Sequence, residues 1–349
     1  MNISLRLTVL LGLALWMIVP ASLSAQDGES ATRQTMAGRN LSAEAAQKLE
    51  LQVKAAPDDV AARTQLLGYY MRLAFTSPEA REARQQHILW LIRNRPDAPV
   101  LSTPFARLDM HLDSSAYEEG RKAWMDQVER QPKSAAILAS AAAYQLLSDS
   151  AAAESLYQRA EAAEPQNPER SRDLGRLYAL GLGRKTGEER RKSAKAALGA
   201  YERSLAHTER EERESLLPEV GALALEAGET VKARGYAEEM LKADSAGWNS
   251  GNLIHHGNLV LGRLALRDGD TKTAQEHLLA AGKTHGSPQL NSFGPNMTLA
   301  KELLEKGERQ AVLEYFKLCG AFWKKSQLDT WSKEVQAGKI PEFGANLDY

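Results

Sequence analysis

The clearest pattern of apolar and polar positions lies between Pro132 and Pro165, where two helical patterns are separated by the polar turn 148–150. Small and large apolar residues alternate at fixed intervals in this stretch: Ala141, Tyr144, Ala153, Tyr157 and Ala160. Small residues that face each other allow two helices to pack closely, and large residues fill the space toward a neighbour. The pattern therefore predicts a hairpin of two antiparallel helices.

The same intervals recur three times further along the chain. A small residue is followed by a turn residue seven positions later, and by small or apolar residues at positions twelve, sixteen and nineteen. The three sets are Gly221, Gly228, Ala233, Ala237 and Met240; Gly262, Gly269, Ala274, Leu278 and Ala281; and Ala300, Gly307, Val312, Phe316 and Cys319. The glycine in each turn suits a helix end, because glycine adopts the left-handed conformation without steric penalty. The chain is therefore predicted to repeat one helical unit.

These intervals resemble those of the tetratricopeptide repeat, a helix–turn–helix unit of about 34 residues. Leu174–Gly175 followed by Tyr178 matches the Leu-Gly-x-x-Tyr signature of the first helix of that repeat. The segment LGRLYALGLG, with its insertion at 181–190, also resembles the related Sel1 repeat. The resemblance covers roughly residues 58–320 and implies an all-α fold, an α-solenoid of about five to seven stacked antiparallel helix hairpins. The block from Trp248 onward also resembles bacterial repeat proteins without an assigned activity.

The first 25 residues have the layout of a secretory signal peptide. Arg6 precedes an apolar run at 7–19, which is followed by Pro20 and by small residues up to Ala25, the expected cleavage position. The run is shorter than the roughly 20 residues that span a bilayer, although a retained signal anchor is an alternative interpretation. The sequence thus predicts an exported protein, periplasmic or secreted, in a bacterial envelope.

The rest of the chain divides by its pattern into four parts. These are a flexible lead-in at 26–40, degenerate helical repeats at 41–131, tetratricopeptide-like repeats at 132–320, and a capping helix with a tail at 321–349. The lead-in has no apolar period. The C-terminal helix is expected to cover the last repeat, because an uncovered terminal repeat would expose apolar surface.

Composition narrows the classes of partner. Lys and Arg total 44 against 45 Asp and Glu, so the net charge of -1 gives no reason to expect nucleic acid as a partner. No stretch after the first 25 residues is long and apolar enough to predict a membrane span. Cys319 is the only cysteine, so an internal disulfide is excluded, and it occupies a small-residue position where we expect burial.

By resemblance, the first helix of each hairpin lines a concave groove that holds extended peptides or partner helices. The candidate groove residues are Arg176, His256, Leu259, Arg263, Arg267 and Lys301. Their arginines predict a mildly basic groove that suits an acidic peptide or protein. The alternative is that these arginines only cover apolar surface with their side-chain stems. In the loops, Trp248, Leu290 and Phe293 are candidates either for ligand contact or for packing against the helices.

Searches for catalytic and metal-binding patterns give no strong match. The sequence has no H-E-x-x-H zinc motif, no G-x-S-x-G nucleophile motif and no phosphate-binding loop, so no cofactor or metal is predicted. His277 is placed to approach His256 across a hairpin, but without a carboxylate partner. We therefore predict a non-catalytic scaffold for protein–protein interaction in the cell envelope. The alternative is an envelope hydrolase with its site at the 248–258 and 282–296 loops.

Overall fold

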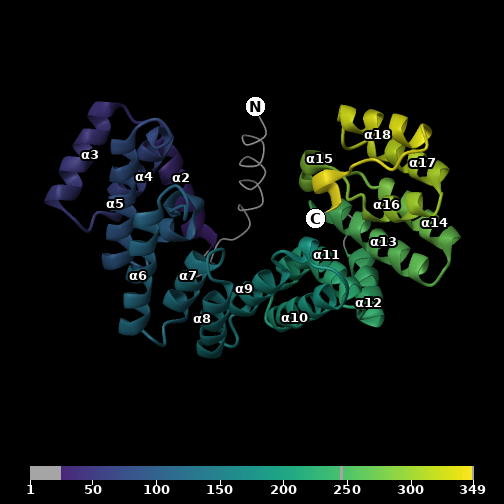
Figure 1. Cartoon of the computed structure of the whole chain (residues 1–349), viewed down its shortest axis with the longest axis horizontal. Helices are drawn as coiled ribbons and strands as arrows, with labels where there is room; N and C mark the ends of the chain where they lie inside the picture. The colour runs from purple at the N-terminus through teal and green to yellow at the C-terminus, as the bar shows by residue number, and fades with distance from the viewer. Residues whose placement is uncertain (1–24, 244–246, 348–349) are drawn as a thin grey trace. The chain divides into compact units, whose positions relative to one another are not determined.

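The computed structural model describes residues 25–243 and 247–347. They fold into 17 α-helices with no strand, so the predicted all-α fold is confirmed (Figure 1). Neighbouring helices pack pairwise in chain order, as in a solenoid-like arrangement. Residues 1–24, which hold nearly all of the predicted signal peptide, lie outside the described residues. The chain divides into two compact units, at 1–177 and 178–349.

The first unit consists of helices joined by short turns. They are α2 (Ala25–Gly38), α3 (Ala43–Ala55), α4 (Val60–Leu73), α5 (Pro78–Asn94), α6 (Ser114–Arg130), α7 (Ala135–Gln145), α8 (Ser150–Ala163) and α9 (Pro168–Ala179), whose last two residues belong to the second unit. Two short 3-10 helices, η2 (Pro99–Ser102) and η3 (Pro104–Ala106), lie between α5 and α6. Five of the α-helices begin after a serine or aspartate whose side chain accepts a backbone N–H three residues later: Ser42, Asp59, Ser77, Ser134 and Asp149. These caps satisfy donors that a helix start otherwise leaves unpaired.

Helices α7 and α8 form the hairpin that the apolar pattern predicts. Ala141, Ala153 and Ala160 are fully buried where the two helices meet. Tyr144 instead reaches α6, where its hydroxyl donates to the carbonyl of Tyr117 at 3.0 Å and the two rings stack. The small residues thus set the contact within the hairpin, and the large residue contacts the neighbouring helix.

Helix α2 occupies most of the segment that we expected to be a flexible lead-in. It packs along α4, with Ala31 and Thr35 buried in the contact. A Cβ atom on Gly68 of α4 would lie 1.9 Å from the carbonyl oxygen of Thr35, so the two backbones nearly touch. Because this contact is made by small residues rather than large apolar ones, it produces no apolar period in the sequence.

The second unit continues the series of hairpins. Its helices are α10 (Gly187–Leu205), α11 (Arg210–Glu226), α12 (Thr230–Lys242), α13 (Ser250–Arg267), α14 (Thr271–Gly282), α15 (Pro288–Phe293), α16 (Thr298–Glu305), α17 (Arg309–Cys319) and α18 (Ser326–Gln336), with 3-10 helices η4 (Leu182–Arg184) and η5 (Gly344–Leu347). The predicted turn glycines Gly228, Gly269 and Gly307 have φ values of 78°, 84° and 89°. Each one ends the first helix of a hairpin in the left-handed conformation, as predicted.

The apolar core of the second unit has two parts. One is formed by α10 to α13, and the other runs from α13 to α18. Cys319 is fully buried in the second part, as expected, and burial raises the pKa of its thiol far above the usual range. Trp331 of α18 contacts Phe343 of the tail at a centroid distance of 5.0 Å and Phe316 of α17 at 6.0 Å. Helix α18 and the tail therefore cover the apolar side of α17.

Candidate binding site on helix α9

Helix α9 carries a dense group of charged side chains just before its Leu-Gly signature. The helix begins after Asn167, whose side-chain oxygen accepts the N–H of Glu169 at 3.1 Å. Leu174 and Gly175 are buried, so the helix position is fixed by packing. The charged group comprises Glu164 from the end of α8 and five residues of α9, Glu169, Arg170, Arg172, Asp173 and Arg176. We refer to these six residues as the α9 charge cluster.

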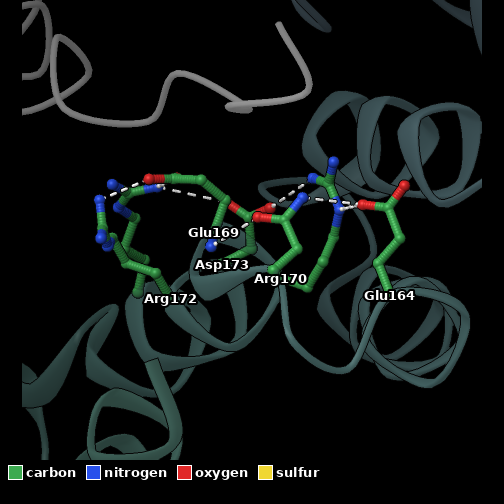
Figure 2. Close-up of polar contacts among 7 residues, drawn as sticks. Glu164, Glu169, Arg170, Arg172 and Asp173 are labelled. Atoms are coloured by element: carbon green, nitrogen blue, oxygen red, sulfur yellow. Dashed lines mark hydrogen bonds and ion pairs between the residues drawn. The ribbon is translucent and has the colours of Figure 1, made fainter. Parts of the chain in front are cut away.

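The side chains of the α9 charge cluster pair along the helix (Figure 2). Arg170 Nε donates to Glu164 Oε2 at 2.9 Å, and its Nη1 lies 3.8 Å from Asp173 Oδ2. Arg176 Nη1 donates to Asp173 Oδ1 at 3.2 Å and lies 3.6 Å from Glu169 Oε2. Arg172 Nη1 donates to Glu169 Oε1 at 2.5 Å. Spacings of three residues place these groups on neighbouring turns of one helix, which fixes their geometry.

Burial makes the α9 charge cluster unusual. The side chains of Arg170 and Asp173 are each 3% exposed. Desolvation raises the pKa of Asp173 to about 7, against the opposing effect of Arg176. Within the described part of the chain, Asp173 Oδ2 and Glu169 Oε2 are buried and accept no hydrogen bond. Each of these two carboxylate oxygens is thus held near a guanidinium group, at 3.8 Å and 3.6 Å, but beyond hydrogen-bond distance of it.

Such a cluster is poorly suited to a purely structural role. Removing charges from water costs more than a buried ion pair typically returns, so apolar residues would stabilise the helix contact at least as well. A buried acceptor without a donor adds a further penalty of about 1–3 kcal/mol. Both penalties are relieved when another molecule supplies N–H donors. The arrangement can therefore recognise a hydrogen-bond donor, and its fixed geometry reduces the ordering cost of binding.

The predicted groove residues are only partly brought together. Arg176 lies in the α9 charge cluster, where the sequence analysis singled out neither Glu169 nor Asp173. Glu169 and Asp173 could have been found in the sequence, because they belong to the run of charged residues ERSRD directly before Leu174.

The arginines of α13 face other helices of the second unit. Arg263 contacts Glu302 of α16 at 2.7 Å and Glu226 of α11 at 3.1 Å. Arg267 Nη1 donates to the carbonyl of Leu225 at 2.7 Å, although much of its side chain is exposed. Arg263, like Arg176, is compensated by two carboxylates, which differs from the basic surface that we expected. Its position is set by the stacking of successive hairpins.

The remaining groove candidates behave differently from one another. Leu259 is buried in the apolar core that runs from α13 to α18, so its prediction as a groove residue is wrong. His256 is partly buried beside His255, with the ring centroids 5.2 Å apart, and burial lowers its pKa. Lys301 of α16 is partly exposed. Of these three residues, Lys301 and His256 keep some access to solvent.

The loop candidates separate by exposure. Leu290 is 1% exposed, so packing accounts for it. Trp248 and Phe293 are 56% and 61% exposed and lie on the surface. The carbonyl of Phe293 accepts a hydrogen bond from Asn346 of the tail at 3.2 Å, which ties the short helix α15 to the C-terminal segment.

His255 and His277 join segments of the second unit through hydrogen bonds. His255 is fully buried, accepts the N–H of Asn296 at 3.1 Å through Nε2, and donates through Nδ1 to the carbonyl of Ala281 at 3.1 Å. His277 bonds to Asn258 at 2.9 Å, and no bond joins it to His256 in the described residues. The same residues contain no group of three potential ligands that could hold a metal ion.

Comparison with known proteins adds no family to these observations. No family model matches the chain, and no curated protein matches it. Among the described helices, none combines the length and apolar content needed to cross a bilayer.

Proposed function

We propose that this chain is a non-catalytic scaffold that binds a protein or peptide partner, with the α9 charge cluster as a contact site. The observation that carries the proposal is the pair of buried acceptors, Asp173 Oδ2 and Glu169 Oε2, that have no donor in the described residues. Stacked helix pairs support this function, because they present fixed side chains over a long surface and lose little freedom on binding. The signal-like sequence at 1–25 supports placing this scaffold in the periplasm or outside the cell.

The chemistry of the α9 charge cluster favours a partner that brings N–H donors. Arg176 is already paired with Asp173 and Glu169, so an acidic partner would compete with internal carboxylates. A lysine side chain or a run of backbone amides would instead donate to the two buried oxygens that accept no hydrogen bond within the described residues. The sequence analysis predicted an acidic partner from the arginines alone, whereas the pairing of Arg176 favours a partner that supplies hydrogen-bond donors.

The test compares capture of partners by three forms of the full chain from a bacterial envelope extract. The site variant carries Glu169→Gln and Asp173→Asn, which replace both carboxyl groups with amides while keeping side-chain size. The control variant carries Glu118→Gln and Asp126→Asn, the same two replacements on the exposed surface of α6, where both residues pair only with neighbours on that helix. Circular dichroism verifies that all three forms are helical.

We expect the wild type and the control variant to retain the same partner and the site variant to lose it by about tenfold or more, the usual effect of a charged contact. Equal retention by all three forms would show that α9 is not the contact site. If none of the three forms retains a partner, the scaffold function itself is contradicted.

One observation favours the hydrolase alternative. Most of the 248–258 segment, which we expected to be a loop, is the start of helix α13, and the 282–296 segment contains α15. Ser250 Oγ in the first segment lies 3.2 Å from His285 Nε2 in the second, a distance suitable for a nucleophile and its base. Against it, Ser250 is 3% exposed, and His285 has no carboxylate partner in residues 25–243 and 247–347. A fluorophosphonate probe, which labels activated serines, tests the hydrolase alternative. Covalent labelling of the wild type that is lost in both Ser250→Ala and His285→Gln would support a hydrolase. Absence of labelling would exclude Ser250 as a nucleophile.

A further inference from the structure

A second site lies in the first unit, where side chains of α3, α4 and α5 surround a pocket of about 390 Å³. Its lining includes Glu50 of α3, Arg63 of α4, and Gln86, His87, Trp90 and Arg93 of α5. The volume is within the range of about 300–1,000 Å³ that is usual for small-ligand sites. None of these residues belongs to the α9 charge cluster.

Arg63 is the best-fixed group in this pocket. It is 6% exposed, and its guanidinium carbon lies 3.6 Å from the ring centre of Trp90, so the cation stacks on the indole. Its Nε donates to the carbonyl of Pro57 at 2.9 Å, and its Nη1 donates to His87 Nδ1 at 3.1 Å. These three contacts hold the plane of the guanidinium in one orientation.

The bond from Arg63 also determines the state of His87. Because arginine only donates, Nδ1 of His87 must accept, and the ring proton therefore lies on Nε2. That Nε2–H donates to Glu50 Oε1 at 2.9 Å, and the same oxygen accepts the hydroxyl of Tyr70 at 2.6 Å. The hydrogen bond from His87 lowers the pKa of Glu50, so this residue is anionic and its charge is directed toward His87 and Tyr70.

One donor group of this network remains open. Nη2 of Arg63 has no hydrogen-bond partner among the described residues, while Nε and Nη1 are both used inside the protein. Arg93, at the edge of the pocket, pairs with Glu119 on the neighbouring helix α6 and is about half exposed. Because Arg93 is paired with Glu119, and Glu50 accepts from His87 and Tyr70, the guanidinium of Arg63 is the cationic group of the lining that has a donor left for a ligand with one negative charge per acid group.

We propose that this pocket binds a carboxylate group, which accepts from Arg63 Nη2 and lies beside the edge of Trp90. Each carboxylate group carries a single charge and can accept one charge-assisted hydrogen bond from Nη2, whereas the charge of Glu50 disfavours the closely spaced charges that phosphate places on one group. The carboxylate belongs either to a free small acid or to the side chain of an acidic residue in another protein. The chemistry is the same for both sources.

The test uses the full chain labelled with 5-fluorotryptophan and observed by fluorine NMR. The chain has six tryptophans, and Trp90→Phe identifies the Trp90 resonance. The probes are succinate, its neutral analogue succinamide, inorganic phosphate, and a blocked tripeptide Ac-Gly-Glu-Gly-NH2 with its Gln counterpart. Succinate and the Glu tripeptide represent the two sources of a carboxylate.

We expect the Trp90 resonance to shift saturably with succinate, with the Glu tripeptide, or with both, and not with succinamide or the Gln tripeptide. Arg63→Lys keeps the charge but loses the planar donors, so it should weaken binding about tenfold. Arg63→Gln should abolish the shift. The matched control is Arg72→Gln, which removes an arginine that stands over Tyr69 on the same helix but outside the pocket.

Several outcomes would overturn this inference. Binding that persists in Arg63→Gln, an equal response to succinamide, or tighter binding of phosphate than of succinate each contradict a carboxylate site at Arg63. A Trp90 resonance that does not move with either carboxylate probe also contradicts it. If Arg63→Lys binds more weakly at an unchanged melting temperature, unfolding is excluded as the cause. Since lysine keeps the positive charge, the weaker binding then reflects the loss of the guanidinium donor.

Discussion

Fully buried His255 joins two parts of the second unit that are far apart in sequence. Its neutral ring donates to Ala281 at the end of α14 and accepts from Asn296 just before α16. Protonation would place an N–H opposite the N–H of Asn296 and would bury a charge. Desolvation accordingly lowers the pKa of His255 from 6.5 to about 4, so the folded state binds its proton less readily than the unfolded state.

The sign of the pH effect follows from this difference in proton binding. Stability from neutral His255 is complete above the unfolded pKa of 6.5 and is lost as the pH falls toward about 4. The difference between the unfolded pKa of 6.5 and the folded pKa of about 4 corresponds to about 3 kcal/mol of unfolding free energy. About 2 kcal/mol of this stability is lost between pH 7 and pH 5. In His255→Gln the amide does not titrate, so this part of the pH dependence should disappear.

The assay is urea unfolding of the full chain at a series of pH values, followed by circular dichroism. The free energy of unfolding should decrease between pH 7 and pH 5 by about 2 kcal/mol more in the wild type than in His255→Gln. Taking this difference cancels the titrating groups that do not interact with His255. Parallel pH profiles for the two proteins would refute the assignment of His255 as a neutral link between the two segments.

Two further substitutions and one thiol-reactivity experiment test the packing. Gly251→Ala would place a Cβ 1.8 Å from the carbonyl oxygen of Gly286 and should destabilise by about 3 kcal/mol in urea unfolding, whereas Gly235→Ala, with open space around it, should not destabilise. Gly68→Ala should push α2 away from α4, so limited proteolysis should cut within α2 in this variant and not in the wild type. Cys319 should not react with Ellman's reagent in the folded chain and should react fully in urea, because burial keeps its thiol protonated; rapid reaction of the folded chain would contradict this.

The hairpins were predictable because their information is local. The interval between Ala141 and Ala153 describes one contact between consecutive helices, and both residues are fully buried there. The turn glycines Gly228, Gly269 and Gly307 mark positions where the backbone alone demands a residue without a side chain. Repetition of the same intervals strengthens each local signal, which is why the all-α fold followed from sequence.

The pocket beside Arg63 was not predictable in the same way. His87 and Glu50 are 37 positions apart, on two helices that each pack against α4, and no periodic pattern relates them. The same holds for Ser250 and His285, which are 35 positions apart. Helix α2 was not predicted for a different reason. Its contact with α4 depends on the absence of side chains at Gly38 and Gly68 rather than on large apolar residues.

The arginines show why the face of a helix is not enough to identify a binding surface. Periodicity assigns Arg263 to one side of α13, but it does not show that Glu226 and Glu302 are placed there by neighbouring hairpins. Once paired, such an arginine offers little net charge to a ligand, however favourable its position on the helix. What a partner can use is the bonding capacity that remains after internal pairing, namely two carboxylate oxygens on α9 and one guanidinium nitrogen on α4. Binding sites in a stack of charged helices are therefore better sought among open donors and acceptors than among unusual concentrations of charge.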